Sequence, residues 1–326
     1  MIKVVHILPC LNYGGTEWSV LKLCKFSKTT ESTVVSLLQG QMEGEFQREG
    51  IPIFVLENIK NSYERYRKAL EVLKKADIIH MNWLYFDWCQ LWLTQQVKVP
   101  YIITLRWRYR LPLLDCVICC VAQNLRAIQD ERNRCVVIPN GVDLTRFTHK
   151  QKVKKKKTDK IIMTSISRPD KCAPYFWLAM KDVLEANPNV ELWIVGGKPW
   201  TAKQIKSLGI RRDIPDILAQ TDIFVYTPYP AVGAFDNVVL EAMAMGVPCV
   251  VSDVECVNEA VTHGKEGLLL PYGDQETLVG ALNSLIENEE YRIQLGQNAL
   301  EKAKKFDIAN VIQKYHELYS SVINSK

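Results

Sequence analysis

The sequence predicts an α/β protein made of two doubly wound parallel-sheet domains. Its 326 residues are enough for two domains that each bury a core. Along residues 1–150, short continuous apolar runs alternate with amphipathic helical patterns, which is typical of a parallel sheet covered by helices on both faces. The alternation resumes after residue 160, although we find no repeat in the sequence itself.

Seven apolar runs in the first half are predicted strands: Ile2–Leu8, Thr33–Leu38, Ile53–Leu56, Ile78–Asn82, Tyr101–Leu105, Cys116–Val121 and Cys135–Ile138. Four segments between them have helical spacing: Glu17–Ser27, Tyr63–Lys75, Phe86–Gln96 and Gln123–Asp130. Pro139-Asn-Gly-Val-Asp143 ends this half with a turn signal. The first domain is therefore predicted to span residues 1–150.

Residues 151–160 are dominated by lysine and predict a solvated linker to a second domain at residues 161–306. Its predicted strands are Ile161–Ser165, Val190–Val195, Ile223–Tyr226, Pro248–Val251 and Leu268–Leu270. Residues 307–326 form a C-terminal helix that could cross back to the first domain, although its pattern does not require this. Two such domains in series would face a central cleft at the carboxyl ends of their strands.

Composition and charge narrow the class of protein. With 48% hydrophobic and 24% charged residues, the chain has the composition of a soluble globular protein, and no apolar run reaches the length of a membrane span. Residues 1–160 contain 26 Lys and Arg against 15 Asp and Glu, whereas residues 161–326 contain 15 against 21. The basic first half predicts an anionic partner, such as a phosphorylated acceptor or an acidic membrane surface. Nucleic acid is the weaker alternative, because no aromatic residues interleave the lysine run.

The ten cysteines are scattered, and no signal peptide precedes the first strand. Cys116-Val-Ile-Cys119 has CxxC spacing, but alternation along a strand directs the two side chains to opposite faces. We therefore expect a reduced, cytoplasmic protein, which would work at the inner face of a membrane if its acceptor is lipid-linked.

The most informative stretch is Gly233-Ala-Phe-Asp-Asn-Val-Val-Leu-Glu-Ala-Met-Ala-Met-Gly246, which is followed by the predicted strand Pro248–Val251. A loop of small residues leads into a helix that starts near Asn237 and ends at Gly246. The first turn of such a helix presents backbone N–H groups to an anion or a sugar hydroxyl. Glu241 lies about one turn inside and could accept hydrogen bonds from a diol.

Two other segments follow the first strand of a domain. Gly14-Gly15 opens the first helix of the chain, either as a ligand-binding loop or as a tight turn capped by Thr16. Arg168-Pro-Asp-Lys171 follows the strand Ile161–Ser165, where two cations could neutralise a diphosphate as its charge builds up. The alternative for this pair is ordinary surface charge.

These motifs resemble those of the family-4 (group 1) glycosyltransferases, whose donor site usually reads Glu-Gly-Phe-Pro/Gly-Asn-Val-Val-Leu-Glu-Ala-Met-Ala. The resemblance is most specific from Leu208 to Asp274. It implies the GT-B fold, in which two Rossmann-like domains bind an acceptor and a nucleotide sugar respectively. It also implies a retaining, metal-independent transfer, with no cofactor, from a nucleotide diphosphate sugar to a glycan or lipid-linked acceptor. The sequence contains no Asp-x-Asp pair that would predict a metal site.

The resemblance also assigns roles to individual residues. Arg168 and Lys171 would stabilise the departing diphosphate as catalytic residues. The donor-binding residues would be Gly14, Gly15, Phe235, Asn237, Val238 and Glu241, with Glu241 on the ribose hydroxyls.

The departures from the family pattern concern the sugar and acceptor side. Gly233 replaces the first glutamate of the family pair, and Arg106 stands where relatives often carry His-Asp. Arg106 and Trp107 could instead form a basic, aromatic wall for an acceptor. His80 either lines the cleft or is a hydrogen-bonded core histidine.

These departures leave two other functions open. The first is a catalytically impaired GT-B subunit that binds a nucleotide sugar or a partner. The second is a sugar-nucleotide epimerase, for which His80 is the only candidate acid or base at neutral pH.

Overall fold

The computed structural model describes residues 1–59, 61–83, 96–106, 109–112, 114–148, 160–167, 172–229, 237–254 and 256–325. The chain divides into two compact units. Unit 1 comprises Met1–Gly141 and Ile308–Lys326, and unit 2 comprises Val142–Asp307. The chain therefore passes between the units at 141/142 and again at 307/308. The expected linker at 151–160 lies outside the described residues except for Lys160.

Unit 1 contains a seven-stranded parallel sheet in the order β3-β2-β1-β4-β5-β6-β7. The strands are β1 (Ile2–Leu8), β2 (Thr30–Ser36), β3 (Ile53–Val55), β4 (Ile78–Trp83), β5 (Tyr101–Leu105), β6 (Val117–Cys120) and β7 (Arg134–Val137). Its helices are α1 (Gly15–Phe26), α2 (Glu43–Arg48), α3 (Ser62–Leu73), α5 (Gln123–Ala127) and α12 (Ile308–Asn324), with a 3₁₀ turn at Leu56–Asn58. All seven strands were predicted. The predicted helix Phe86–Gln96 lies outside the described residues apart from Gln96.

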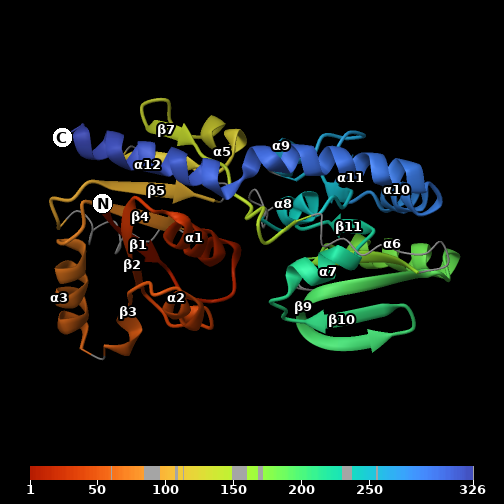
Figure 1. Ribbon diagram of the computed structural model, residues 1–326, viewed down its shortest axis with the longest axis horizontal. Coiled ribbons are helices and arrows are strands. Elements are labelled where there is room, and N and C mark those ends of the chain that lie inside the picture. Colours follow the sequence, from red (N-terminus) through yellow and green to blue (C-terminus); the bar gives the residue numbers. More distant parts are fainter. Residues whose placement is uncertain are drawn as a thin grey trace. The chain divides into compact units, whose positions relative to one another are not determined.

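The last helix, α12, packs in unit 1, and Figure 1 shows it in dark blue running across the strands of that unit. Its buried side chains recur at helical spacing: Ile308, Val311, Tyr315, Leu318 and Tyr319. They join a core cluster that includes Val4, Ile78, Ile102 and Val117 from four different strands. A second cluster, on Val20, Val34 and Phe46, fills the space around α1 and α2.

Unit 2 contains a six-stranded sheet in the order β10-β9-β8-β11-β12-β13. The strands are β8 (Ile161–Ile166), β9 (Val190–Ala202), β10 (Ile205–Gly209), β11 (Ile223–Tyr226), β12 (Cys249–Ser252) and β13 (Gly267–Leu270). Its helices are α6 (Pro174–Ala186), α7 (Ile214–Gln220), α8 (Asn237–Ala244), α9 (Val257–Ala260), α10 (Gln275–Glu287) and α11 (Glu289–Ala303), followed by a 3₁₀ turn at Lys304–Phe306.

The core of unit 2 lies between this sheet and the helices α6 and α10. Phe176, Met180 and Val183 of α6 pack with Leu278, Leu282 and Leu285 of α10 against strand residues such as Leu192 and Val250. Both sets recur every three or four residues, which places each set on one helical face.

The two sheets share one topological feature that locates ligand sites. In each sheet the strand order reverses between two central neighbours: β1 and β4 in unit 1, and β8 and β11 in unit 2. Doubly wound sheets bind ligands at this switch point, in the crevice outside the carboxyl ends of the strands. The loops that follow β1, β8 and β11 are therefore the loops to examine for function.

Candidate functional site

In unit 2, α8 begins at Asn237 directly after the loop that follows β11. Asn237 and Leu240 are buried, whereas Val238 and Glu241 are only partly buried. Val238 and Glu241 are three residues apart and therefore share a helix face, so the start of α8 presents a carboxylate beside its first turn. Gly246, with φ 67°, ends the helix, and its N–H donates to the carbonyl of Met243 at 2.9 Å.

The residues predicted to act on the diphosphate and the sugar belong to the loops that follow β8 and β11. These two strands are neighbours, with Ile223 opposite Met163 and Phe224 opposite Thr164, so their carboxyl ends are adjacent. The fold thus connects both predicted loops and α8 to the switch point of unit 2. Five predicted site residues lie outside the described residues: Trp107, Arg168, Lys171, Gly233 and Phe235.

Several hydroxyl groups lie near the carboxyl ends of these strands, and the sequence analysis did not identify them as site residues. The hydroxyls of Tyr175 in α6 and Ser252 at the end of β12 are 2.5 Å apart. The ring of Tyr272 meets that of Tyr175 edge-on, with centroids 5.4 Å apart. Ser165 in β8 is 1% exposed, and its Oγ has no partner among the described residues. Isolated hydroxyl residues carry no motif, so only the strand order could have brought them together.

In unit 1, the Gly14-Gly15 loop follows β1 and starts α1. Gly14 is the N-cap with extended backbone, so Thr16, the second residue of α1, is not the capping residue. A Cβ on Gly14 would lie 2.4 Å from Oε2 of Glu17, whose side chain folds back over the loop. A side chain at this position would displace the Glu17 carboxylate, so glycine lets that carboxylate lie over the loop.

Glu17 is a buried carboxylate, only 2% exposed. Its Oε1 accepts a hydrogen bond from the thiol of Cys10 at 3.6 Å. Burial raises the pKa of Glu17, while the nearby positive charge of Arg106 acts in the opposite direction. The glycine loop is thus backed by a buried acid that no motif predicted.

His80 is a core histidine, the second of the two alternatives, because it is fully buried and hydrogen-bonded on both sides. Its Nδ1 lies 2.7 Å from the hydroxyl of Tyr319, and its Nε2 lies 2.6 Å from Oγ1 of Thr104. Burial lowers the pKa of His80 well below its usual value, and the charges of His6 and Arg106 act in the same direction. Because both ring nitrogens are hydrogen-bonded inside the core, His80 is poorly placed to be the acid or base that an epimerase needs.

Arg106 follows β5 and is also buried, with 5% of its surface exposed. Its Nη1 donates a hydrogen bond to Oδ1 of Asn140. Its Nε has no partner among the described residues. The printed bond of the guanidinium is thus made within unit 1, while Trp107, the other residue of the predicted acceptor wall, lies outside the described residues.

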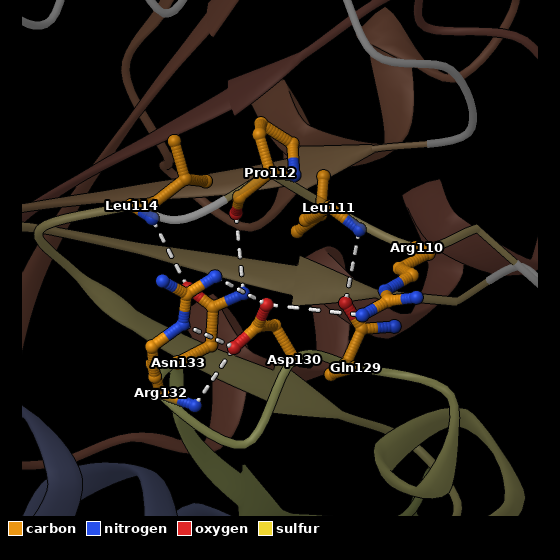
Figure 2. A network of polar contacts seen from close by, with 8 residues as sticks. All are labelled: Arg110, Leu111, Pro112, Leu114, Gln129, Asp130, Arg132 and Asn133. Carbon is orange, nitrogen blue, oxygen red and sulfur yellow. Dashed lines mark hydrogen bonds and ion pairs between the residues drawn. The ribbon is translucent and has the colours of Figure 1, made fainter.

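The segment that follows Arg106 is fastened by the amide side chains drawn in Figure 2. Gln129 accepts a hydrogen bond from the N–H of Leu111 at 3.0 Å. Asn133 accepts one from the N–H of Leu114 at 3.0 Å and donates to the carbonyl of Pro112 at 3.1 Å. The two amides thus hold the described residues 109–112 and 114 on the turn after α5.

Two family models match the sequence. The model described as "Glycosyl transferases group 1" matches residues 159–288, and the model described as "Glycosyltransferase Family 4" matches residues 13–146. Together they cover most of the chain, and each match falls mainly in one of the two units.

Two curated relatives match parts of the chain. The UDP-Gal:alpha-D-GlcNAc-diphosphoundecaprenol alpha-1,3-galactosyltransferase of Escherichia coli is 29% identical over 216 residues, which are 58% of this chain and 55% of the relative. The N,N'-diacetylbacillosaminyl-diphospho-undecaprenol alpha-1,3-N-acetylgalactosaminyltransferase of Campylobacter jejuni is 36% identical over 118 residues, which are 36% of this chain and 31% of the relative. The matched regions thus span about half or less of these relatives.

Solved structures match over nearly the whole chain. HepE from Anabaena, in complex with UDP and glucose, gives a TM-score of 0.81 at 19% identity and covers 98% of this chain and 100% of that chain. A glycosyltransferase from Rickettsia africae gives 0.80 at 14% identity and covers 100% and 99% respectively. At these identities the likeness establishes the fold, which is that of the GT-B glycosyltransferases.

Proposed function

The chain belongs to the group 1, family 4 glycosyltransferases, and on this premise we propose that it transfers a sugar from a nucleotide diphosphate sugar to a glycan or lipid-linked acceptor. The observation that carries the proposal is the start of α8, where Glu241 and the first helical N–H groups follow the loop at the switch point of unit 2.

In the proposed donor complex, Glu241 accepts hydrogen bonds from the ribose hydroxyls, and the N–H groups of Asn237 and Val238 bind the diphosphate or the sugar. Arg168 and Lys171 neutralise the charge that develops on the departing diphosphate, which lowers the barrier more than it strengthens ground-state binding. On the other unit, Gly14 and Gly15 let a ligand approach the backbone at the start of α1.

We propose a retaining transfer without a metal. An acceptor hydroxyl attacks the anomeric carbon on the face from which the diphosphate leaves, the bond between that carbon and the phosphate oxygen breaks, and the hydroxyl proton passes to the departing phosphate. The cations at 168 and 171 would carry the role that a divalent ion has elsewhere. The family resemblance and the absence of an Asp-x-Asp pair from the sequence support this part of the proposal.

For the acceptor, we propose a lipid-linked sugar. The E. coli and C. jejuni relatives are both named for acceptors on diphosphoundecaprenol. The excess of basic residues in the first half would suit such an acceptor and an anionic membrane surface. No helix among the described residues is long and apolar enough to cross a bilayer. We propose that any contact with the membrane is peripheral and is made through the basic first half of the chain.

The test combines binding and turnover. A thermal-shift panel of UDP-, GDP-, ADP- and TDP-sugars should identify a donor, since a ligand at ~100 times its Kd stabilises by ~2.7 kcal/mol. Glu241→Ala should abolish that shift, whereas the matched change Glu290→Ala, at an exposed carboxylate of α11, should leave it intact. Slow hydrolysis of the donor, lost in Lys171→Ala, should accompany binding.

Two other outcomes have distinct meanings. A shift without turnover on any acceptor would favour the impaired subunit, the alternative motivated by Gly233 and by Arg106. If no sugar nucleotide raised the melting temperature, the donor site assigned to unit 2 would be wrong.

A further inference from the structure

In unit 1, Lys22 and Arg106 bind the buried residues Asn140 and Gly141, where the chain leaves the unit, and we call this arrangement the cationic clasp. Asn140 and Gly141 are the last two residues of the N-terminal part of unit 1, and both are buried. Nζ of Lys22 in α1 donates to the carbonyl of Gly141 at 2.5 Å. Nη1 of Arg106, at the end of β5, donates to Oδ1 of Asn140. Two cations from separate elements thus hold two consecutive residues.

The first turn of α12, with which the chain returns to unit 1, also packs against Gly141. A Cβ on Gly141 would lie 3.0 Å from Cα and 2.9 Å from Cδ1 of Ile308, and 3.1 Å from Cγ2 of Val311. Glycine therefore lets the outgoing chain lie directly against the first turn of α12. Since α1 also packs on α12, the three segments form one assembly.

A small cavity marks the centre of this assembly and is lined by Ser19, Lys22, Arg106, Asn140, Gly141 and Tyr315, among others. It lies within unit 1, and its polar lining comes from α1, the end of β5, the outgoing segment and α12. The cavity shows that Arg106 and α1 face the same space. The start of α1 is the Gly14-Gly15 loop, and Ser19 Oγ donates to the carbonyl of Gly15 at 2.8 Å.

Burying the charge of Arg106 to make a hydrogen bond with a neutral amide is unfavourable in free energy. Among the described residues no carboxylate lies within ion-pair distance of it, and its Nε has no partner there. Burying a cation without full compensation costs free energy, so an apolar residue would serve stability better. The planar guanidinium donates hydrogen bonds in fixed directions, so its role at such a site is to hold a segment in one position.

We propose that Lys22 and Arg106 are positioning residues, which hold the 140–141 segment against the helix that follows the glycine loop. Arg106 then acts through Asn140 and does not contact an acceptor. Because 141/142 is one of only two places where the chain passes between the units, the clasp fixes one of the two attachments of unit 2 to unit 1. The importance of this position for sugar transfer rests on the proposed function, whereas the clasp itself does not.

Hydrogen exchange on the full chain tests the clasp without assuming any activity. In Lys22→Met and Arg106→Met, amide exchange of peptides covering residues 136–147 should rise about tenfold relative to wild type, because a charge-assisted hydrogen bond is lost. Lys25→Met is the matched control, since Lys25 lies on the same helix but is exposed and pairs with Glu49. Its exchange at 136–147 should be unchanged. Exchange within α6 and α10 of unit 2 should be unchanged in all three variants.

Unchanged exchange at 136–147 in Lys22→Met would overturn the proposal, and so would an equal rise throughout unit 1. Lys22 is only half-buried, so its variant stays informative if Arg106→Met fails to fold. In the transfer assay, Lys22→Met should lower kcat about tenfold while the KM for the donor changes less than about twofold, because the hydrogen bond of Lys22 is to Gly141 and not to a proposed donor residue. Absence of transfer by the wild type would count against the proposed function alone and would leave the exchange result valid.

Discussion

His6 and His80 lie side by side on neighbouring strands, with ring centroids 5.1 Å apart. On the same face of the sheet, Thr104 and Cys119 continue a polar row across β5 and β6. The hydroxyls of α12 cover this row, since Tyr319 bonds His80 and Tyr315 lies 3.2 Å from Thr104 Oγ1. The polar row thus gives α12 a defined position on the sheet.

The buried histidines predict how stability responds to acid. Burial lowers the pKa of His6 to about 3, so between pH 6.5 and about 3 the unfolded chain binds one more proton than the folded chain. The free energy of unfolding should therefore fall by up to about 1.4 kcal/mol per pH unit for this histidine as the pH drops below 6.5. His6→Leu should flatten that slope in urea unfolding measured from pH 4.5 to 7, whereas His263→Leu, at an exposed position, should not. Equal slopes for wild type and His6→Leu would show that His6 can be protonated in the folded state.

Arg106 and His80 show what the sequence could not predict about individual site residues. Arg106 follows an apolar strand, where active-site residues of a doubly wound fold are found, and His80 lies within the neighbouring strand β4, so a role in the cleft was a reasonable interpretation. Their burial depends on α12, which comes from the other end of the chain. The identity of a residue on a strand face does not reveal which distant element will cover it.

At the scale of elements, a close backbone contact explains one of two helical glycines and not the other. A Cβ on Gly296 in α11 would lie 2.3 Å from the carbonyl oxygen of Gly246, the residue that ends α8. Gly280 in α10 is exposed, and a Cβ there would meet nothing within 4 Å. The first glycine is required for the approach of α11 to α8, and the second is not.

This difference predicts opposite effects of the same substitution. Gly296→Ala should destabilise unit 2 by about 1–3 kcal/mol because a backbone oxygen has to move. Since α8 carries Glu241, the variant should also bind the donor more weakly. Gly280→Ala should stabilise by about 0.5–1 kcal/mol, because alanine is the better helix former. Differential scanning calorimetry of the two variants against wild type gives the comparison, and a stabilising Gly296→Ala would contradict the packing of α11 on α8.

Among the elements, central strands were predicted best because continuous apolar runs need no knowledge of their neighbours. The short helix α2 and the edge strand β10 were not predicted, because each has few residues and little apolar periodicity. The strand β9 was expected to end at Val195, but it continues to Ala202, which pairs with Ile205 of β10 across a tight turn. The ends of such strands depend on which strands they pair with, and the sequence alone does not reveal this. The helix expected at Gln123–Asp130 ends at Ala127, and beyond it the amides of Gln129 and Asn133 bind Leu111 and Leu114 instead.

At the scale of the molecule, the core clusters of the described residues each belong to one unit: one fills unit 2 and two fill unit 1. The core of unit 1 depends on α12, so the two ends of the chain must meet before that unit is complete. Unit 2 is continuous in sequence and needs no such closure. The composition predicted two domains, but only the structure assigns the last helix to the first of them.

Separate cores predict two calorimetric transitions that respond to different changes. Leu318→Ala in α12 and Leu282→Ala in α10 each remove a buried side chain and should cost about 2–5 kcal/mol. For units of this size, each kcal/mol lowers the midpoint by about 2–4 °C. Leu318→Ala should therefore lower only the unit 1 transition, and Leu282→Ala only that of unit 2.

A sugar nucleotide that binds as proposed should raise the unit 2 transition in wild type and in Leu318→Ala alike. A single transition that both variants lower equally would show that the two units unfold together. A donor that raised only the unit 1 transition would contradict the assignment of the nucleotide site to unit 2.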